Sequence, residues 1–185
     1  MAETNKLLLE RYVEYIERLA KEKSTEIFTN GGIEYASQLM AVLFRYTENE
    51  ARIFCQGFKP NLIKTEPYWG ALNNFLNDSC KTFKVLVETD DYANQEPILL
   101  LKQKKVERNN DGTISIRLVT EQDKQEMFKR LNGKPCNFAV FDDNKFRFEY
   151  EPNGYRAFGS FNNEESSQKL ITLFDDAFTN ARELD

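Results

Sequence analysis

The sequence predicts an α/β protein in which helices flank a mixed central β-sheet. Strand-like and helix-like segments alternate over the first two thirds of the chain, and three strand-like segments at short spacing precede a closing helix. Alternation favours parallel strands joined by helices, whereas short turns favour antiparallel hairpins. Because no internal repeat, linker or domain boundary divides the 185 residues, we expect one layered α/β domain over residues 1–185.

Apolar residues spaced three and four apart indicate the helices, and short apolar runs between turn residues indicate the strands. We expect helices at 5–23, 33–46, 67–79, 97–107, 121–132 and 163–184, although 98–101 also fits a strand. We expect strands at 26–29, 51–56, 83–88, 113–119, 137–141, 146–151 and 156–160. Turns at 142–144 and 152–154 connect the last three strands as hairpins.

The composition favours a cytoplasmic protein without a membrane segment. No stretch approaches the roughly 18 apolar residues of a membrane span, and the N-terminus lacks the features of a secretory signal. The net charge is −5, and the only dense basic cluster, at 102–105, is interpreted as a solvated helix face. A nucleic acid remains open as a partner, although this charge does not favour one.

The sequence contains no histidine. This excludes Ser-His-Asp and Cys-His catalysis, histidine-based metal sites and phosphohistidine intermediates. The cysteines, Cys55, Cys80 and Cys136, show no CxxC spacing, and we interpret them as buried thiols. No cofactor is expected.

The stretch FGSFNNEESSQKL at 158–170 reads as a polar turn that opens a helix. Asn162 is expected as the N-cap residue, with Glu165 completing a capping box. This part of the chain resembles the C-terminal part of the phospholipase D superfamily, in which an H-x-K-x4-D motif precedes a G-S-x-N turn. The matching order here is a strand, Asp142, a hairpin, the turn Gly159-Ser160-Phe161-Asn162 and a long helix. The resemblance implies the layered α/β fold of that family, paired as a homodimer.

The resemblance also implies that the catalytic chemistry is missing. If Asp142 stands at the aspartate of the motif, its histidine position falls on Pro135 and its lysine position on Asn137. The family's reaction needs one imidazole to attack phosphorus and another to protonate the leaving group, and neither is present. Anion binding is the function that could remain, with Gly159, Ser160, Asn162, Arg156 and Arg147 as its candidate residues.

A metal-dependent nuclease or phosphodiesterase is the alternative prediction. Asp142, Asp143 and Glu149 are acidic residues close in sequence, and clustered carboxylates hold Mg²⁺ for phosphodiester cleavage without histidine.

The sequence therefore predicts a catalytically inactive phospholipase D-like domain that acts as a binding, regulatory or assembly module. A second copy is the expected partner, with another protein or a phosphate-containing ligand as further candidates. The aromatic candidates for a dimer interface are Tyr12, Tyr15, Trp69 and Tyr155.

Overall fold

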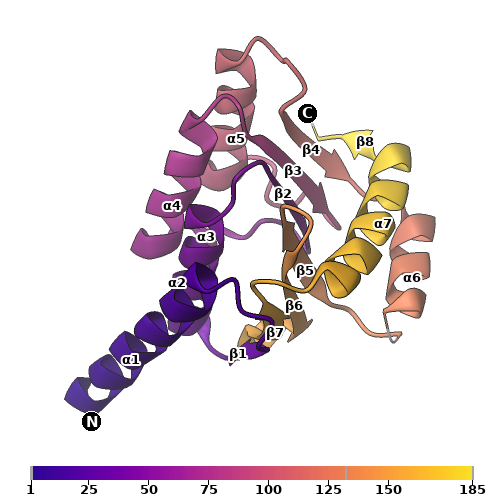
Figure 1. Ribbon diagram of the computed structural model, residues 1–185. Coiled ribbons are helices and arrows are strands. Elements are labelled where there is room, and N and C mark those ends of the chain that lie inside the picture. The colour runs from indigo at the N-terminus through magenta and orange to yellow at the C-terminus, as the bar shows by residue number, and fades with distance from the viewer. Residues whose placement is uncertain (1, 132, 185) are drawn as a thin grey trace.

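The computed structural model describes residues 2–131 and 133–184, which form an eight-stranded mixed sheet (Figure 1). Its order is β1-β7-β6-β5-β2-β3-β4-β8, in which β2, β3 and β4 are parallel and the remaining pairings are antiparallel. The strands are β1 Phe28–Asn30, β2 Glu50–Cys55, β3 Thr82–Val87, β4 Ile114–Leu118, β5 Asn137–Phe141, β6 Lys145–Glu151, β7 Arg156–Ser160 and β8 Arg182–Glu183.

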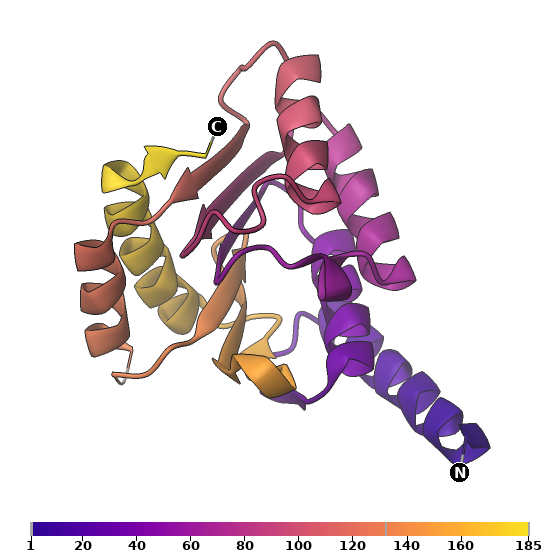
Figure 2. The same ribbon diagram turned by 180° about the vertical axis from the view of Figure 1, so that it is seen from behind.

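Helices cover both faces of this sheet (Figures 1 and 2). One layer holds α2 Ile33–Arg45, α3 Pro60–Ile63, α4 Glu66–Asn77 and α5 Glu96–Glu107, and the other holds α6 Glu121–Arg130 and α7 Glu164–Asn180. Helix α1, Ala2–Lys21, packs along α2 with its C-terminal half, and its N-terminal end extends away from the sheet. Among the described residues, no helix combines the length and the apolar character needed to cross a bilayer.

Each helical layer buries its own apolar cluster against the sheet. The cluster under α1 to α5 is centred on Phe44, whose ring packs edge-on against Phe75 and Phe141 at centroid separations of 5.3 and 5.2 Å. The cluster under α6 and α7 includes Phe54 and Phe174, both fully buried. This layering confirms the predicted fold class: helices flank a mixed sheet.

The predicted elements correspond to those of the structure, with two differences. The short helix α3 was not predicted, because Pro60 begins a single turn that is too short for a periodic pattern. The last helix ends at Asn180 and not at residue 184. Arg182 and Glu183 instead pair with β4 at the sheet edge, where the Glu183 carboxylate lies 3.0 Å from Nε of Arg117.

Candidate ligand-binding site

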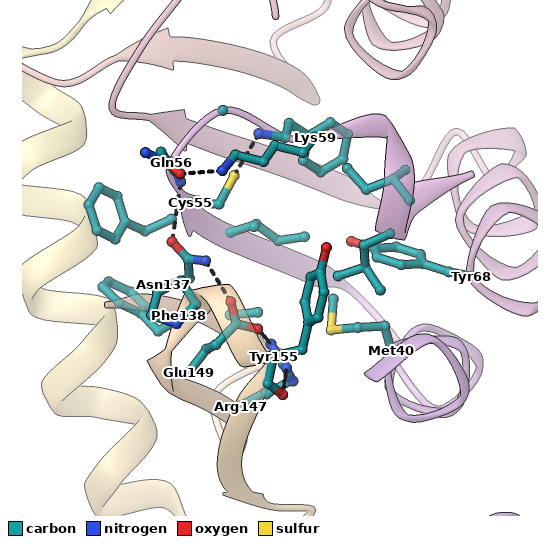
Figure 3. A pocket seen from close by; sticks show the side chains of 18 of the residues that line it. Met40, Cys55, Gln56, Lys59, Tyr68, Asn137, Phe138, Arg147, Glu149 and Tyr155 are labelled. Atoms are coloured by element: carbon teal, nitrogen blue, oxygen red, sulfur yellow. Dashed lines mark hydrogen bonds and ion pairs between the residues drawn. The ribbon is translucent and has the colours of Figure 1, made fainter. Parts of the chain in front are cut away.

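A cavity of about 270 Å³ lies at the edge of the sheet where the parallel strands end (Figure 3). Its walls come from the segment after β2, helix α3, the start of α4, the beginning of β5, and the end of β6 with the turn η1, Pro152–Gly154. In α/β sheets with parallel strands, this carboxyl edge is where ligands bind. The position makes the cavity the leading candidate for a binding site.

A buried ion pair forms the polar floor of the cavity. Arg147 and Glu149 alternate on β6 and therefore face the same side of the sheet, where Nη1 of Arg147 lies 2.5 Å from Oε2 of Glu149. The side chain of Asn137, opposite Glu149 on β5, donates to Oε1 of Glu149 at 2.7 Å and accepts from the backbone N–H of Gln56 at 3.2 Å. This chain of contacts joins β6, β5 and the end of β2.

The remaining nitrogens of Arg147 anchor the hairpin between β6 and β7. Nε donates to Oδ1 of Asn30 at 3.3 Å, and Nη2 donates to the carbonyl of Tyr155 at 3.3 Å. The Asn30 amide donates to the same carbonyl at 2.7 Å. Because Arg147 is only 5% exposed and all three of its nitrogens have partners, its main role in this structure is to hold Tyr155 at the cavity.

Two tyrosine side chains enter the cavity from opposite walls (Figure 3). Tyr68 comes from the first turn of α4, is 2% exposed and lines the cavity. Tyr155 comes from the hairpin, and its hydroxyl accepts from the amide of Asn61 at 2.8 Å, which leaves the phenolic proton free. Burial raises the pKa of both hydroxyls, so both remain protonated donors at neutral pH.

The backbone is strained at two residues that line the cavity. Phe58 and Tyr155 have φ values of 55° and 52°, in the left-handed region that bulky residues rarely occupy. Such conformations persist where the surrounding structure holds them, and they concentrate at functional sites.

The charged residues that line the cavity are Lys59, Arg147 and Glu149, so positive charge is in excess by one. Lys59 hydrogen-bonds the side chain of Gln56 and lies 5.9 Å from the ring centroid of Tyr92. The partner of Arg147 is Glu149, which leaves Lys59 as the charge that a ligand would meet.

The thiols of Cys55 and Cys136 offer no nucleophile at neutral pH. Burial raises the pKa of Cys55, which lines the cavity, and of Cys136 to about 12. Only the thiolate is reactive, so both groups are inert at physiological pH. The interpretation of the cysteines as buried thiols is confirmed for Cys136, whereas Cys55 is half-buried and Cys80 is exposed.

The Gly-Ser-Phe-Asn turn lies at the other end of the strands. β6 runs from the Asp142 turn toward the cavity and β7 runs back, so Ser160 pairs with Phe146. The Ser160 side chain is buried, accepts from the backbone N–H of Asn162 at 3.2 Å and contacts the carbonyl of Ser24 at 3.4 Å. The motif is therefore distant from the cavity along the sheet.

The residues of this turn serve the fold. Asn163 is the N-cap of α7 and accepts from the backbone N–H of Ser166 at 2.9 Å, so the assignment of Asn162 was wrong by one residue. A Cβ atom at Gly159 would lie 2.0 Å from the carbonyl oxygen of Phe146 and 2.6 Å from the ring of Phe28. Glycine is required there because two neighbouring groups fill the space.

Asp142 anchors the turn between β5 and β6. Its carboxylate accepts from the backbone N–H groups of Glu48, Asn49 and Glu50 at 3.0, 2.8 and 3.2 Å, and from Lys145 at 2.7 Å. Burial acts to raise the pKa of Asp142, but these hydrogen bonds outweigh it and leave the pKa below its usual value.

The predicted metal ligands are not brought together. Asp142 lies at the start of β6 and Glu149 near its end, where Arg147 and Asn137 bind it, and Asp143 is exposed. Within residues 2–131 and 133–184, no three acidic, histidine or cysteine side chains are placed to hold a metal ion.

The five candidate anion-binding residues do not form one site. Arg147 lines the cavity, whereas Arg156 is an exposed residue whose Nη1 lies 3.4 Å from Glu151.

Sequence reasoning missed Tyr68 and Asn61. Tyr68 has the helical phase of a core residue, since it lies four positions before Leu72, and periodicity does not show that its hydroxyl faces a cavity.

Comparison with known proteins identifies the fold. No family model and no curated protein matches the sequence. Among solved structures, Nuc from Salmonella typhimurium, a phospholipase D family member, is 10% identical with a TM-score of 0.54, and the match covers 85% of this chain and 98% of that one. The chain has the phospholipase D-like fold.

Other structures extend this likeness. NucT from Helicobacter pylori is 9% identical with a TM-score of 0.53, covering 85% of this chain and 99% of that one. TrmBL2, described as an archaeal chromatin protein with a novel mode of DNA binding, is 15% identical with a TM-score of 0.53. That match covers 98% of this chain but only 64% of the TrmBL2 chain. At these identities the likeness concerns the fold alone.

Proposed function

We propose that this chain is a binding module on a phospholipase D-like fold, and that its cavity at the carboxyl edge of the sheet holds a small ligand without cleaving a phosphodiester. One observation carries the proposal. The motif positions that would supply histidine and lysine hold Pro135 and Asn137. Asn137 lines the cavity, and the two charged residues of its floor, Arg147 and Glu149, neutralise each other.

The reaction class follows from what the cavity lacks. Nucleophilic attack on phosphorus needs an activated nucleophile, and proton transfer to a leaving group needs an acid with a pKa near neutrality. The thiol of Cys55 and the phenol of Tyr68 both have pKa values far above 7, and Glu149 is bound to Arg147 and Asn137. Hydroxyl groups that can donate hydrogen bonds remain in the lining, and these support binding.

The test is turnover by the purified chain. Bis(p-nitrophenyl) phosphate, single-stranded DNA and double-stranded DNA are incubated with Mg²⁺, with Mn²⁺ and with EDTA, and a commercial phosphodiesterase serves as the positive control. We expect no release above background in any condition. Metal-dependent cleavage would contradict the proposal and favour the nuclease alternative if Asp143→Ala abolishes it and Asp91→Ala retains it. Asp91 is the control because its carboxylate lies on another loop.

The partner is proposed to be a second copy of this chain. The phospholipase D-like fold supports this proposal, because the resemblance to that family implies a paired homodimer. Light scattering coupled to size exclusion measures the mass directly: twice 21.7 kDa is expected, and a mass of 21.7 kDa across the concentration range would contradict it. Because the fold also resembles that of TrmBL2, DNA binding is tested by fluorescence anisotropy with labelled DNA. The net charge of −5 predicts that this chain binds DNA weakly.

A further inference from the structure

We infer that the cavity recognises a small carboxylate attached to an apolar body, with the hydroxyl groups of Tyr68 and Tyr155 as the donors that bind it. This inference rests on the proposed binding function and names the class of ligand.

The first argument concerns the hydrogen-bonding groups that remain free. The acceptor oxygens of Glu149 are both engaged, one by Asn137 and one by Arg147. Tyr68 and Tyr155 both line the cavity, and the Tyr155 hydroxyl accepts from Asn61 and retains its proton for donation. The cavity therefore has an excess of donors and favours an acceptor group.

The second argument concerns charge. The lining carries two cations and one carboxylate, and the tyrosines stay neutral because burial raises their pKa values. A singly charged oxyanion balances this excess of one positive charge, whereas a phosphate dianion would leave an uncompensated negative charge in a poorly solvated site.

The third argument concerns the shape and chemistry of the walls. Met40, Ile53, Leu62 and Phe138 contribute apolar surface beside the polar groups. A volume of about 270 Å³ suits a compact molecule. Hydroxyl donors together with apolar side chains in the lining fit an acid with a short hydrocarbon or aromatic body.

The geometry of this site differs from a phosphate subsite built on an H-x-K pair. The donors belong to the first turn of α4 and to the hairpin after β6, and neither lies at the motif positions 135 and 137. Figure 3 shows the two phenol rings entering from opposite walls, with their hydroxyl groups directed at the space between them.

The test uses probes with a shared body and different head groups. Binding of benzoate, benzamide and phenyl phosphate, and of butyrate, butyramide and butyl phosphate, is measured by isothermal titration calorimetry. We expect at least one carboxylate to bind about tenfold tighter than its amide and its phosphate. Tyr68→Phe and Tyr155→Phe should each weaken that binding about tenfold or more, because a hydrogen bond to a charged group is lost. Tyr15→Phe, whose hydroxyl contacts Glu26 outside the cavity, should leave it unchanged.

Each result decides one question. The carboxylate inference is overturned if an amide binds as well as its acid, if a phosphate binds tighter, or if no probe binds. The proposed function is overturned by a different result, phosphodiester turnover in the separate assay. Thermal unfolding of Tyr68→Phe gives a ligand-free readout. If the Tyr68 hydroxyl serves the ligand and not the fold, its removal should not lower the melting temperature, and a clear drop would show that the protein itself uses this donor.

Discussion

Replacing Asp142 by alanine should destabilise the protein severely, although this residue is one of the acids that a nuclease mechanism would use. The substitution removes three hydrogen bonds from backbone N–H groups and one from Lys145. Hydrogen bonds to charged groups contribute roughly 1.5–3 kcal/mol each, with strong non-additivity. The residue also has a φ of 53°, which aspartate tolerates better than alanine. A loss of about 4 kcal/mol in unfolding free energy is expected.

Two matched variants isolate this effect. Asp142→Asn keeps one acceptor oxygen and tolerates the left-handed backbone, so we expect a loss of about 2 kcal/mol. The neighbouring Asp143 is exposed, and Asp143→Ala should stay within about 0.5 kcal/mol of the wild type. Urea denaturation followed by circular dichroism gives all three values. A loss for Asp142→Ala within about 1 kcal/mol of that for Asp143→Ala would refute the anchoring role.

The pH dependence supplies a second check on Asp142. Its pKa in the folded protein lies below the unfolded value of about 3.9, so the carboxylate stabilises the fold above that pH. This contribution disappears as the pH falls through the folded pKa. The stability difference between the wild type and Asp142→Asn should therefore be full at pH 6 and shrink on acidification below about 4. A difference that grows on acidification would contradict the sign of the shift.

Further predictions concern packing and the thiols. Gly159→Ala should lower the free energy of unfolding by about 3 kcal/mol, because its Cβ would lie 2.0 Å from the Phe146 carbonyl oxygen. Gly70→Ala, at an exposed site in α4, should instead raise the free energy of unfolding by about 0.5–1 kcal/mol. Urea denaturation measures both values. Iodoacetamide at pH 8 should modify Cys80 and leave Cys55 and Cys136 unmodified until the protein unfolds, as intact mass spectrometry would reveal. Because the pKa of the two protected thiols rises from 9.0 to about 12 on folding, stability should fall as the pH rises above 9, and a rise in stability there would contradict the shift.

The layered fold could be predicted because it depends on local patterns. Periodic apolar residues indicated the helices, and the turn at 142–144 marked a hairpin that the pairing of Phe141 with Lys145 confirms. The short edge strand β8 could not be predicted, because a pairing of two residues depends on β4, which is distant in sequence.

The site was harder to predict for a topological reason. The Gly159-Ser160 pair matches a family motif in sequence, but β7 runs away from the cavity and places these residues at the opposite end of the strands. Arg147 and Glu149 were singled out separately, as an anion partner and a metal ligand, whereas the structure pairs them with each other. A pattern of residue types does not reveal which charged side chains form ion pairs with each other. This pairing decides whether a side chain is free to bind a ligand.

The most direct test of where this protein binds is an NMR titration of ¹⁵N-labelled protein with sodium benzoate and sodium butyrate. Binding in the cavity predicts backbone amide shifts at Gln56 to Lys59, Tyr68, Asn137 and Tyr155, and in Tyr68→Phe these shifts should need about tenfold more ligand to reach saturation. Shifts confined to residues 160–163, just before α7, would place the ligand at the Gly-Ser-Phe-Asn turn and contradict the account.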